Sequence, residues 1–570
     1  MKKKAAYLFL LAIDGGLILI LTMALLILVS GGTEFYWQKR LVTAYSANNL
    51  LLLVTFLLPL RMLLADWIPF LGIPALSMKN ISDKSHSLCI EFYNQLINLK
   101  RDQVWRLVLA IIVASAVIKI ANAWFYYGFI SGDDVEIHEM AFARLFQRQW
   151  PVWDIRNAFY PMVFIYPAQA LLKALGNQDP RLLVFAGRMV VVLFSSLSIY
   201  LVYKVAAEIE GGLHIGLLAA FFFAFSKLHV TFGGSELPRT VAASFILLAF
   251  WFLLRSRTNA AVVCLAGIAL GIAAATRFSE LIFILPAGSF LLGERRWRHA
   301  TILVFCFVFS FLLILGISDW LYWKKAFFSL INIVDFTLVK KLSSRGYQPF
   351  YHYLFDFSKW TNIFVVAMVA FTFKMKKWRL LTWIIMPLGL LSLLPHKEPR
   401  YLIPVIPFMA ILTAVAVSQL LRTMSERHAL ALGGKIRKLA AFLLFLFAIS
   451  MLVEMDGFRF RKSETAVDIA RYLAAHPARG VIAMEDIWHF GGNIYLTDVA
   501  NIRNVASADL AQQEYVTNLL TYGDLEYLAM KNQTIIKNGY EEVIAKSGFS
   551  EITASTGKGY QRFRLFKKGH

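Results

Sequence analysis

The turn "HKEPR", residues 396–400, lies between two long apolar runs. Lys397 and Arg400 suit a phosphate, because arginine offers a two-pronged donor fork and lysine a compact point charge. A single cation beside a membrane commonly reaches toward the lipid headgroups, but five residues in one tight turn cannot all do so. The turn is therefore a candidate phosphate-binding element. His396 is either a base or, more simply, a packed and hydrogen-bonded side chain.

Two adjacent aspartates, Asp133 and Asp134, directly follow another apolar run and open a long polar segment. A carboxylate at this position could act as a general base on a sugar hydroxyl. The alternative is a solvated acid that caps the following helix. Spacing alone leaves both interpretations open and does not rank the two aspartates.

Further ionisable or aromatic residues lie in separate segments inside or beside apolar sequence. Charges at membrane depth are costly and usually face a cavity or a partner. We therefore expect these groups to share one polar pocket at the outer membrane boundary. They are Glu136, His138, Glu139, Trp153, Asp154, Glu236, Arg239, Arg277, Glu280 and Asp319.

The elements that must position these groups are membrane spans. The chain has 570 residues, is 58% hydrophobic and only 16% charged, and its mean hydropathy is +0.59. Several apolar runs are long enough to cross a hydrocarbon core about 30 Å thick. The net charge of +22 is better explained by basic loops beside a membrane than by nucleic acid. The three scattered cysteines predict neither a disulfide framework nor a metal cluster.

The sequence predicts about thirteen transmembrane helices, the first retained rather than cleaved as a signal peptide. The run 160–175 is short and contains two prolines, so we interpret it as an interfacial or re-entrant helix. The predicted spans are 5–30, 47–68, 107–127, 183–203, 214–230, 240–255, 259–275, 278–292, 299–319, 360–373, 379–395, 401–421 and 438–455.

Short basic loops such as "GERRWRH" and "FKMKKWR" place the N-terminus in the cytoplasm and "HKEPR" outside. From about residue 457 the pattern changes to alternating strands and amphipathic helices, typical of a small soluble α/β domain. An odd span number places this tail outside. The predicted domains are an extension at 1–106, a transmembrane module at 107–456 with outer loops 128–182 and 319–359, and the tail at 457–570.

At these motifs the chain resembles the mannosyltransferases that act in GPI-anchor and dolichol-linked-oligosaccharide synthesis, glycosyltransferase family 22, within the wider GT-C fold. "HKEPRYLIPVIPFMAI" is similar to that family's His-Lys-Glu-x-Arg-Phe motif, with Tyr401 for Phe. "GDDVEIHEMAFARLFQRQWPVWD" resembles its first-loop motif, and "SRGYQPFYHYL", which contains Tyr347, resembles a later loop. The family's His-Pro before the acids is Ser-Gly here.

The resemblance implies an inverting glycosyltransferase in a bacterial inner membrane. It would move a sugar, mannose by this likeness, from a polyprenyl-phosphate donor to a glycan or lipid-linked acceptor on the periplasmic face. Asp133 or Asp134 would be the base, and Lys397 and Arg400 would neutralise the departing phosphate. No metal or other cofactor is expected. The predicted substrate-binding residues are Glu139, Trp153, Asp154, Glu236, Arg239, Arg277, Asp319, Tyr347, His396, Lys397, Glu398 and Arg400.

Two other functions compete with this one. A transporter or flippase of lipid-linked glycans would often show repeated halves and a ligand near mid-membrane, whereas no repeat is visible and the polar residues gather on one face. A non-catalytic membrane scaffold that displays the tail would leave the charged outer turns unexplained. The glycosyltransferase is the preferred function.

Overall fold

The chain folds into two compact units in the computed structural model. The helical unit comprises Met1–Lys119, Val191–Ile317 and Val334–Arg459, and the loop-and-tail unit comprises Ile120–Val190, Ser318–Ile333 and Phe460–His570. The structure describes residues 2–30, 33–37, 40–44, 50–51, 53–54, 57, 61, 78–126, 128–148, 150, 152–256, 259–340, 347–426, 433–455, 464–476, 478–496, 501–521, 524–552 and 563–569.

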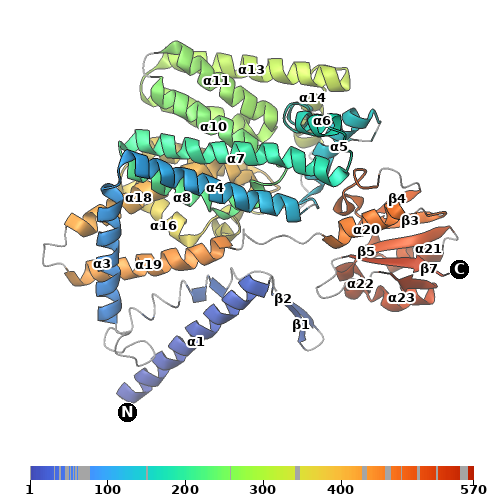
Figure 1. Cartoon of the computed structure of the whole chain (residues 1–570), viewed down its shortest axis with the longest axis horizontal. Helices are drawn as coiled ribbons and strands as arrows, with labels where there is room; N and C mark the ends of the chain where they lie inside the picture. Colours follow the sequence, from blue (N-terminus) through green and yellow to red (C-terminus); the bar gives the residue numbers. More distant parts are fainter. Residues whose placement is uncertain are drawn as a thin grey trace. The chain divides into compact units, whose positions relative to one another are not determined.

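Long apolar helices make up the helical unit (Figure 1), as expected where no water is present to satisfy the backbone. Small residues let some of these helices approach closely. A Cβ added at Gly271 would overlap the Ser310 hydroxyl, and one at Gly267 would meet the backbone of Leu303. Helix α11 is therefore in direct contact with α13.

The helical unit contains the following elements among the described residues. They are α1 (Lys2–Ser30), β1 (Thr33–Trp37), β2 (Arg40–Ala44), α3 (Met78–Ile97), most of α4 (Arg101–Phe125) and α7 (Pro180–Glu210), α8 (Leu213–Ala224), α9 (Lys227–Phe232), α10 (Pro238–Arg255), α11 (Ala260–Thr276), η4 (Phe278–Phe283), α12 (Ile284–Gly293), most of α13 (Trp297–Trp323), η5 (Asp335–Val339), α15 (His352–Phe355), η7 (Phe357–Lys359), α16 (Ile363–Lys374), α17 (Trp378–Leu393), η8 (Pro399–Val405), α18 (Ile406–Glu426) and α19 (Gly433–Met455).

Six helices among the described residues are long and apolar enough to cross a membrane. Shorter apolar helices coincide with most of the other predicted spans. The span predicted at 214–230 is interrupted, because α8 ends at Ala224 and α9 begins at Lys227, and the one at 278–292 divides into η4 and α12. The span predicted at 47–68 lies mostly outside the described residues. The protein is an integral membrane protein with a helical membrane part, as predicted.

The loop-and-tail unit joins three stretches that are far apart in the sequence: Ile120–Val190, which contains the first polar loop (128–182), Ser318–Ile333, and the tail from Phe460. The π-helix η3 leads directly into α6, so the run predicted at 160–175 is helical. The unit's elements are α5 (Gly132–Phe146), η3 (Pro161–Ile165), α6 (Tyr166–Ala174), α14 (Phe328–Val334), α20 (Glu464–Ala475), β3 (Val481–Glu485), η11 (Ile487–Phe490), β4 (Ile502–Val505), η12 (Asp509–Ala511), α21 (Gln513–Thr521), β5 (Leu525–Lys531), α22 (Asn532–Asn538), α23 (Tyr540–Lys546), β6 (Phe549–Glu551) and β7 (Phe563–Lys568).

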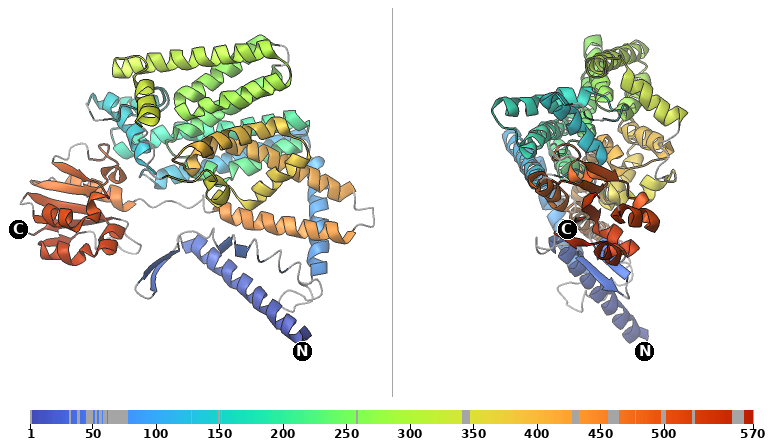
Figure 2. Two further views of the ribbon diagram at one scale, coloured as in Figure 1. Left: turned by 180° about the vertical axis from the view of Figure 1, so that it is seen from behind. Right: turned by 90° about the vertical axis from the view of Figure 1, so that its right-hand side faces the viewer.

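A five-stranded sheet with the order β4-β3-β5-β7-β6 forms the centre of the tail (Figure 2). Strand β3 pairs in parallel with β4 and β5, whereas β7 runs antiparallel to β5 and β6. Three of these strands, β3, β5 and β7, were predicted from their apolar patterns. Strands β4 and β6 were missed, because the short β6 and the largely polar β4, "IRNV", carry little apolar alternation.

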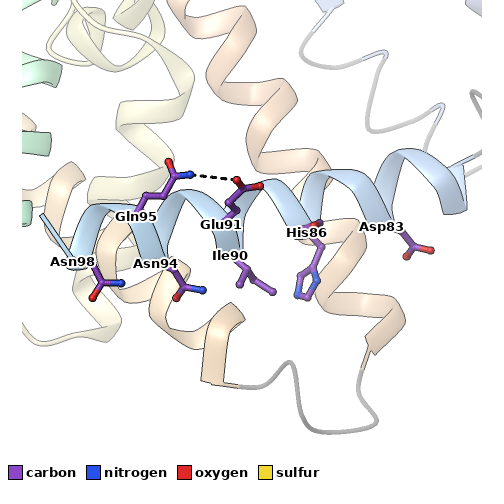
Figure 3. A pocket seen from close by; sticks show the side chains of 8 residues that line it. Asp83, His86, Ile90, Glu91, Asn94, Gln95 and Asn98 are labelled. Carbon is purple, nitrogen blue, oxygen red and sulfur yellow. Dashed lines mark hydrogen bonds between the residues drawn. The ribbon is translucent and has the colours of Figure 1, made fainter.

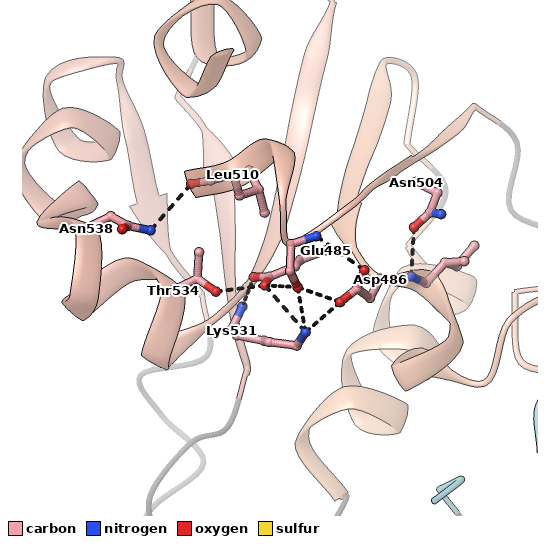
Figure 4. Close-up of polar contacts among 9 residues, drawn as sticks. Glu485, Asp486, Asn504, Leu510, Lys531, Thr534 and Asn538 are labelled. Atoms are coloured by element: carbon pink, nitrogen blue, oxygen red, sulfur yellow. Dashed lines mark hydrogen bonds and ion pairs between the residues drawn. The ribbon is translucent and has the colours of Figure 1, made fainter. Parts of the chain in front are cut away.

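A polar network closes the carboxyl edge of β3 and β5 (Figure 4). The buried Glu485 accepts hydrogen bonds from the hydroxyls of Ser507, at 2.8 Å, and Thr534, at 2.7 Å. The Lys531 ammonium contacts Asp486 Oδ2 at 2.6 Å. Burial opposes the ionised form of Asp486, but Lys531 and Ser507 outweigh burial and hold the pKa of this carboxyl below its ordinary value.

Candidate active site

An arginine cluster forms in the helical unit where η4, η8 and the start of α10 meet. Arg239 pairs with Glu280 at 3.3 Å, and its guanidinium carbon lies 4.1 Å from the centre of the Tyr401 ring. Arg277 and Arg400 interact electrostatically with both Arg239 and Tyr401. Three predicted arginines from three separate segments are therefore brought together, as expected for an anion site.

The "HKEPR" turn is tied together by its own charges. Glu398 accepts hydrogen bonds from both Arg400 and His396, the latter at 3.1 Å. Burial opposes the ionised form of Glu398, but Arg400 and His396 outweigh it and set the pKa of this carboxyl below its ordinary value. The hydroxyl of Tyr353 donates to the Glu398 carbonyl at 3.2 Å.

Lys397 joins this turn to the segment that contains Tyr347. Its ammonium donates to the carbonyl of Gln348, at 2.8 Å, and to that of Leu394. Tyr347 and His396 form a β-bridge. Lys397 is only 6% exposed, and burial lowers the pKa of its ammonium. Two of its three N–H donors are thus used in shaping the turn. The Tyr347 side chain itself is exposed.

An acidic cluster forms at the start of α5 in the loop-and-tail unit. Arg156, which the sequence analysis did not single out, pairs with Asp133 at 2.5 Å and also with Glu136. Burial opposes the charged form of Arg156, but these two carboxylates outweigh it and raise the pKa of the guanidinium. A lone arginine two residues after "WD" was the only signal for this role in the sequence.

The two aspartates differ in accessibility. Asp134 is fully buried, and its Oδ2 accepts a hydrogen bond from the backbone N–H of Ser131 at 3.1 Å. That contact caps α5, as in the alternative raised from the sequence, although the carboxyl is buried and not solvated. The Asp133 side chain is 25% exposed. Of the two aspartates, Asp133 is the one that combines a charged partner with access from outside.

Asp319, Asp154 and Trp153, three other predicted residues, make contacts within this unit. The buried Asp319 accepts hydrogen bonds from the backbone N–H and hydroxyl of Ser329, at 2.9 and 2.7 Å, and so connects α13 to α14. The side-chain amide of Asn332 donates to the Asp154 carbonyl at 3.3 Å. The Arg156 guanidinium lies 5.2 Å from the centre of the exposed Trp153 ring.

Glu139 contacts the tail. Its Oε1 accepts the backbone N–H of Asn493 at 2.8 Å and the Asn493 side-chain amide at 2.9 Å. Burial is the main influence on Glu139 and raises the pKa of its carboxyl, although the two hydrogen bonds from Asn493 oppose that change. Asn493 was not predicted, because nothing in the sequence relates it to residues 354 positions earlier.

Two further predicted residues are buried, and a polar pocket lies elsewhere in the helical unit. Glu236 is fully buried just before α10, and His138 is a packed histidine whose Nδ1 is 2.8 Å from the Gln169 amide nitrogen. This pocket, of about 710 Å³, is lined by residues of α3 and by Asn98 directly after it, and contains none of the predicted site residues (Figure 3). In the described part of the chain, no group of three or more His, Cys, Asp or Glu side chains could hold a metal ion.

Comparison with known proteins identifies both a family and a fold. The model of the Alg9-like mannosyltransferase family matches residues 135–496. GPI mannosyltransferase 3 of Yarrowia lipolytica is 23% identical over 389 residues, which is 64% of this chain and 71% of that protein. The alpha-1,2-mannosyltransferase ALG9 of Mus musculus is 25% identical over 307 residues, covering 50% of this chain and 49% of the relative.

A solved structure shares the fold over most of its length. The crystal structure of ArnT from Cupriavidus metallidurans in the apo state has a TM-score of 0.52 at 13% identity, and covers 80% of this chain and 97% of its own. The structure of the same protein bound to undecaprenyl phosphate gives a TM-score of 0.51 at 14% identity. This likeness confirms the predicted GT-C fold.

Proposed function

Because the chain belongs to the Alg9-like mannosyltransferase family, we propose that this membrane glycosyltransferase transfers mannose from a polyprenyl-phosphate donor. The acceptor is a glycan or a lipid-linked glycan on the periplasmic face of a bacterial inner membrane. The N-terminus is cytoplasmic and the tail periplasmic. The observation that carries the donor assignment is the arginine cluster at the turn before α18. ArnT, which shares the fold, binds undecaprenyl phosphate.

The arginine cluster acts on the leaving group in this proposal. As the bond between the sugar C1 and the phosphate oxygen breaks, negative charge grows on the phosphate. Arg400 donates to it, Arg239 and Arg277 add positive potential, and Lys397 contributes its third N–H. Such preorganised donors are worth most where charge develops in the transition state. A lipid phosphate must lie at the membrane boundary for its chain to stay in hydrocarbon.

The acidic cluster acts on the acceptor. The acceptor hydroxyl oxygen attacks C1 from the face opposite the phosphate, and the carboxylate of Asp133 accepts the hydroxyl proton. We assign this role to Asp133 because Asp134 is fully buried and caps α5. One displacement inverts the anomeric centre and leaves polyprenyl phosphate as the second product. The proposal requires no metal.

The decisive experiment is a transfer assay with the purified protein and a panel of polyprenyl-phosphate sugars. Product formation with the mannose donor, with inverted anomeric configuration by NMR and unchanged rates in EDTA, supports the proposal. Transfer from a different sugar donor would correct the substrate. Movement of a lipid-linked glycan across vesicles without any transfer would favour the flippase instead.

A further inference from the structure

The tail sheet buries its two faces in different ways. One face packs against α21, α22 and α23, all within the tail. The other face packs against α20, but its apolar core also includes Phe129, Val135, Phe142 and Leu145 from the first polar loop. Three of these four residues belong to α5. The tail therefore completes its core with the helix that carries the acidic pair.

One tail segment, Ile487–Leu496, makes the closest contacts with α5. A Cβ added at Gly132 would lie 3.6 Å from the Trp488 ring, and one at Gly492 would collide with Val135 and Glu139. Positions 132, 135 and 139 recur at the spacing of a single helix face. That face of α5 thus meets the tail over about two turns.

The acidic cluster occupies a different side of the same helix. Asp133 and Glu136 pair with Arg156, whereas Glu139 pairs with Asn493. Glu139 is 6% exposed. Burial of a carboxylate without hydrogen bonds would cost free energy, and the two hydrogen bonds from the tail offset part of that cost. The segment itself starts directly after the Glu485–Asp486–Lys531 network, and Ile487 donates its N–H to Asn504 at 2.9 Å.

We propose that the tail segment Ile487–Leu496 positions α5, and through it Asp133, for proton abstraction. Glu139 is then a positioning residue that accepts hydrogen bonds from the tail, and not a substrate contact. This inference rests on the proposed role of Asp133. A displacement of about 1 Å at a reacting group can cost roughly 10²-fold in rate, so a modest shift of α5 has a large expected effect.

A disulfide tests the docking without reference to activity. The Cβ of residue 132 would lie 3.9 Å from the Cβ of Trp488, within the range that a disulfide spans. We expect Gly132→Cys with Trp488→Cys to cross-link on mild oxidation in a background without native cysteines. Gly132→Cys with Gly539→Cys is the control, because nothing lies within 4 Å of a Cβ at Gly539. Failure of the first pair to cross-link would overturn the docking.

Gly492→Ala tests the positioning, with Gly539→Ala as its matched control. Both glycines have positive φ, +55° and +68°, but only the methyl group at 492 would press on α5. We expect kcat to fall about 10- to 100-fold in Gly492→Ala with the donor KM unchanged, and Gly539→Ala to behave like the wild type. Equal kcat values in the two variants would contradict the proposal.

Glu139 itself separates positioning from substrate binding, and provides a second route if Gly492→Ala fails to fold. Gln keeps the oxygen that Asn493 needs and removes the charge, so Glu139→Gln should keep kcat within about threefold. Glu139→Ala should lower kcat by at least tenfold. Loss of activity in Glu139→Gln, with the cross-link intact, would make Glu139 a substrate contact and end the positioning role.

The base role of Asp133 and the positioning role of the tail are tested separately by these variants. If Asp133→Asn keeps full activity while Gly492→Ala loses it, the base assignment is wrong but the tail still governs the reaction. If Asp133→Asn is inactive while Gly492→Ala and Glu139→Ala are fully active, Asp133 is supported as the base and the positioning role of the tail is wrong.

Discussion

The arginine cluster and the acidic cluster both gather predicted charged residues, but they are held in place differently. The arginine cluster is built from turns at the ends of apolar helices, and Glu280 and Glu398 within those turns pair with its cations. The acidic cluster lies on α5, and a neighbouring face of the same helix packs against a tail more than three hundred residues away in sequence. In the proposed mechanism, phosphate binding therefore depends on contacts within the helical unit, and proton abstraction on a contact between α5 and the tail.

This contrast predicts that the acidic cluster is the more sensitive of the two to a single atomic change. Asp133→Asn should lower kcat by about 10³-fold, because a positioned general base commonly contributes 10²–10⁴. Donor binding should be unaffected, and any fall in the melting temperature should be limited to the loss of one partly exposed ion pair with Arg156. Asp134→Ala should instead lower the melting temperature, since it removes the oxygen that caps α5, a loss of about 1 kcal/mol. Asp509→Asn, an exposed tail acid, is the control. The reverse pattern would make Asp134 the base.

Arg400→Ala should give the second largest effect, about 10²- to 10³-fold in kcat, the usual loss for one transition-state donor. Arg379→Ala serves as the control, because that arginine is mostly exposed and pairs with Glu294. In the alternative role, Arg400 only stabilises the turn through its ion pair with Glu398. In that case Glu398→Gln would reproduce the whole loss, and donor binding by the folded Arg400→Ala protein would be normal.

Lys397→Met should have an intermediate effect, about tenfold in kcat/KM. The variant loses the ammonium's contribution to the phosphate and its bonds to the carbonyls of Gln348 and Leu394. We therefore expect a lower melting temperature as well, because those carbonyls lose a charged donor. A lower kcat/KM with an unchanged melting temperature would show that Lys397 is not needed to stabilise the turn. A lower melting temperature with an unchanged kcat/KM would show that Lys397 does not bind the phosphate.

The smallest expected effect concerns the pH dependence of stability at Glu139. Its folded-state pKa is raised, chiefly by burial, so the folded state holds this proton more tightly than the unfolded state. Stability contributed by Glu139 is therefore greatest at low pH and declines as pH rises through the window above about 4.5. Glu139→Gln should melt a degree or two higher than wild type at pH 7, with the difference vanishing near pH 4. A constant difference across this range would refute the linkage.

The predicted membrane helices follow from local sequence, because an apolar run must satisfy its own backbone in lipid. Most spans were predicted to within several residues, and the run predicted at 160–175 is helical. The break between Ala224 and Lys227 was missed because hydropathy does not record where a helix bends. Strands β4 and β6 were missed because their pairing, and not their composition, makes them strands.

From the sequence we could predict that this chain spans a membrane, that its charges lie in turns such as "HKEPR", and which arginines and aspartates suit phosphate and proton chemistry. Those properties reside in residue type and short spacing. The folded structure was needed to show that Arg156 pairs with Asp133, that Asp134 is a buried cap, and that Glu139 binds Asn493. Each of these depends on the meeting of separate segments. Contacts between distant segments are stabilised by burial and by hydrogen-bond geometry, and neither can be predicted from a local sequence pattern.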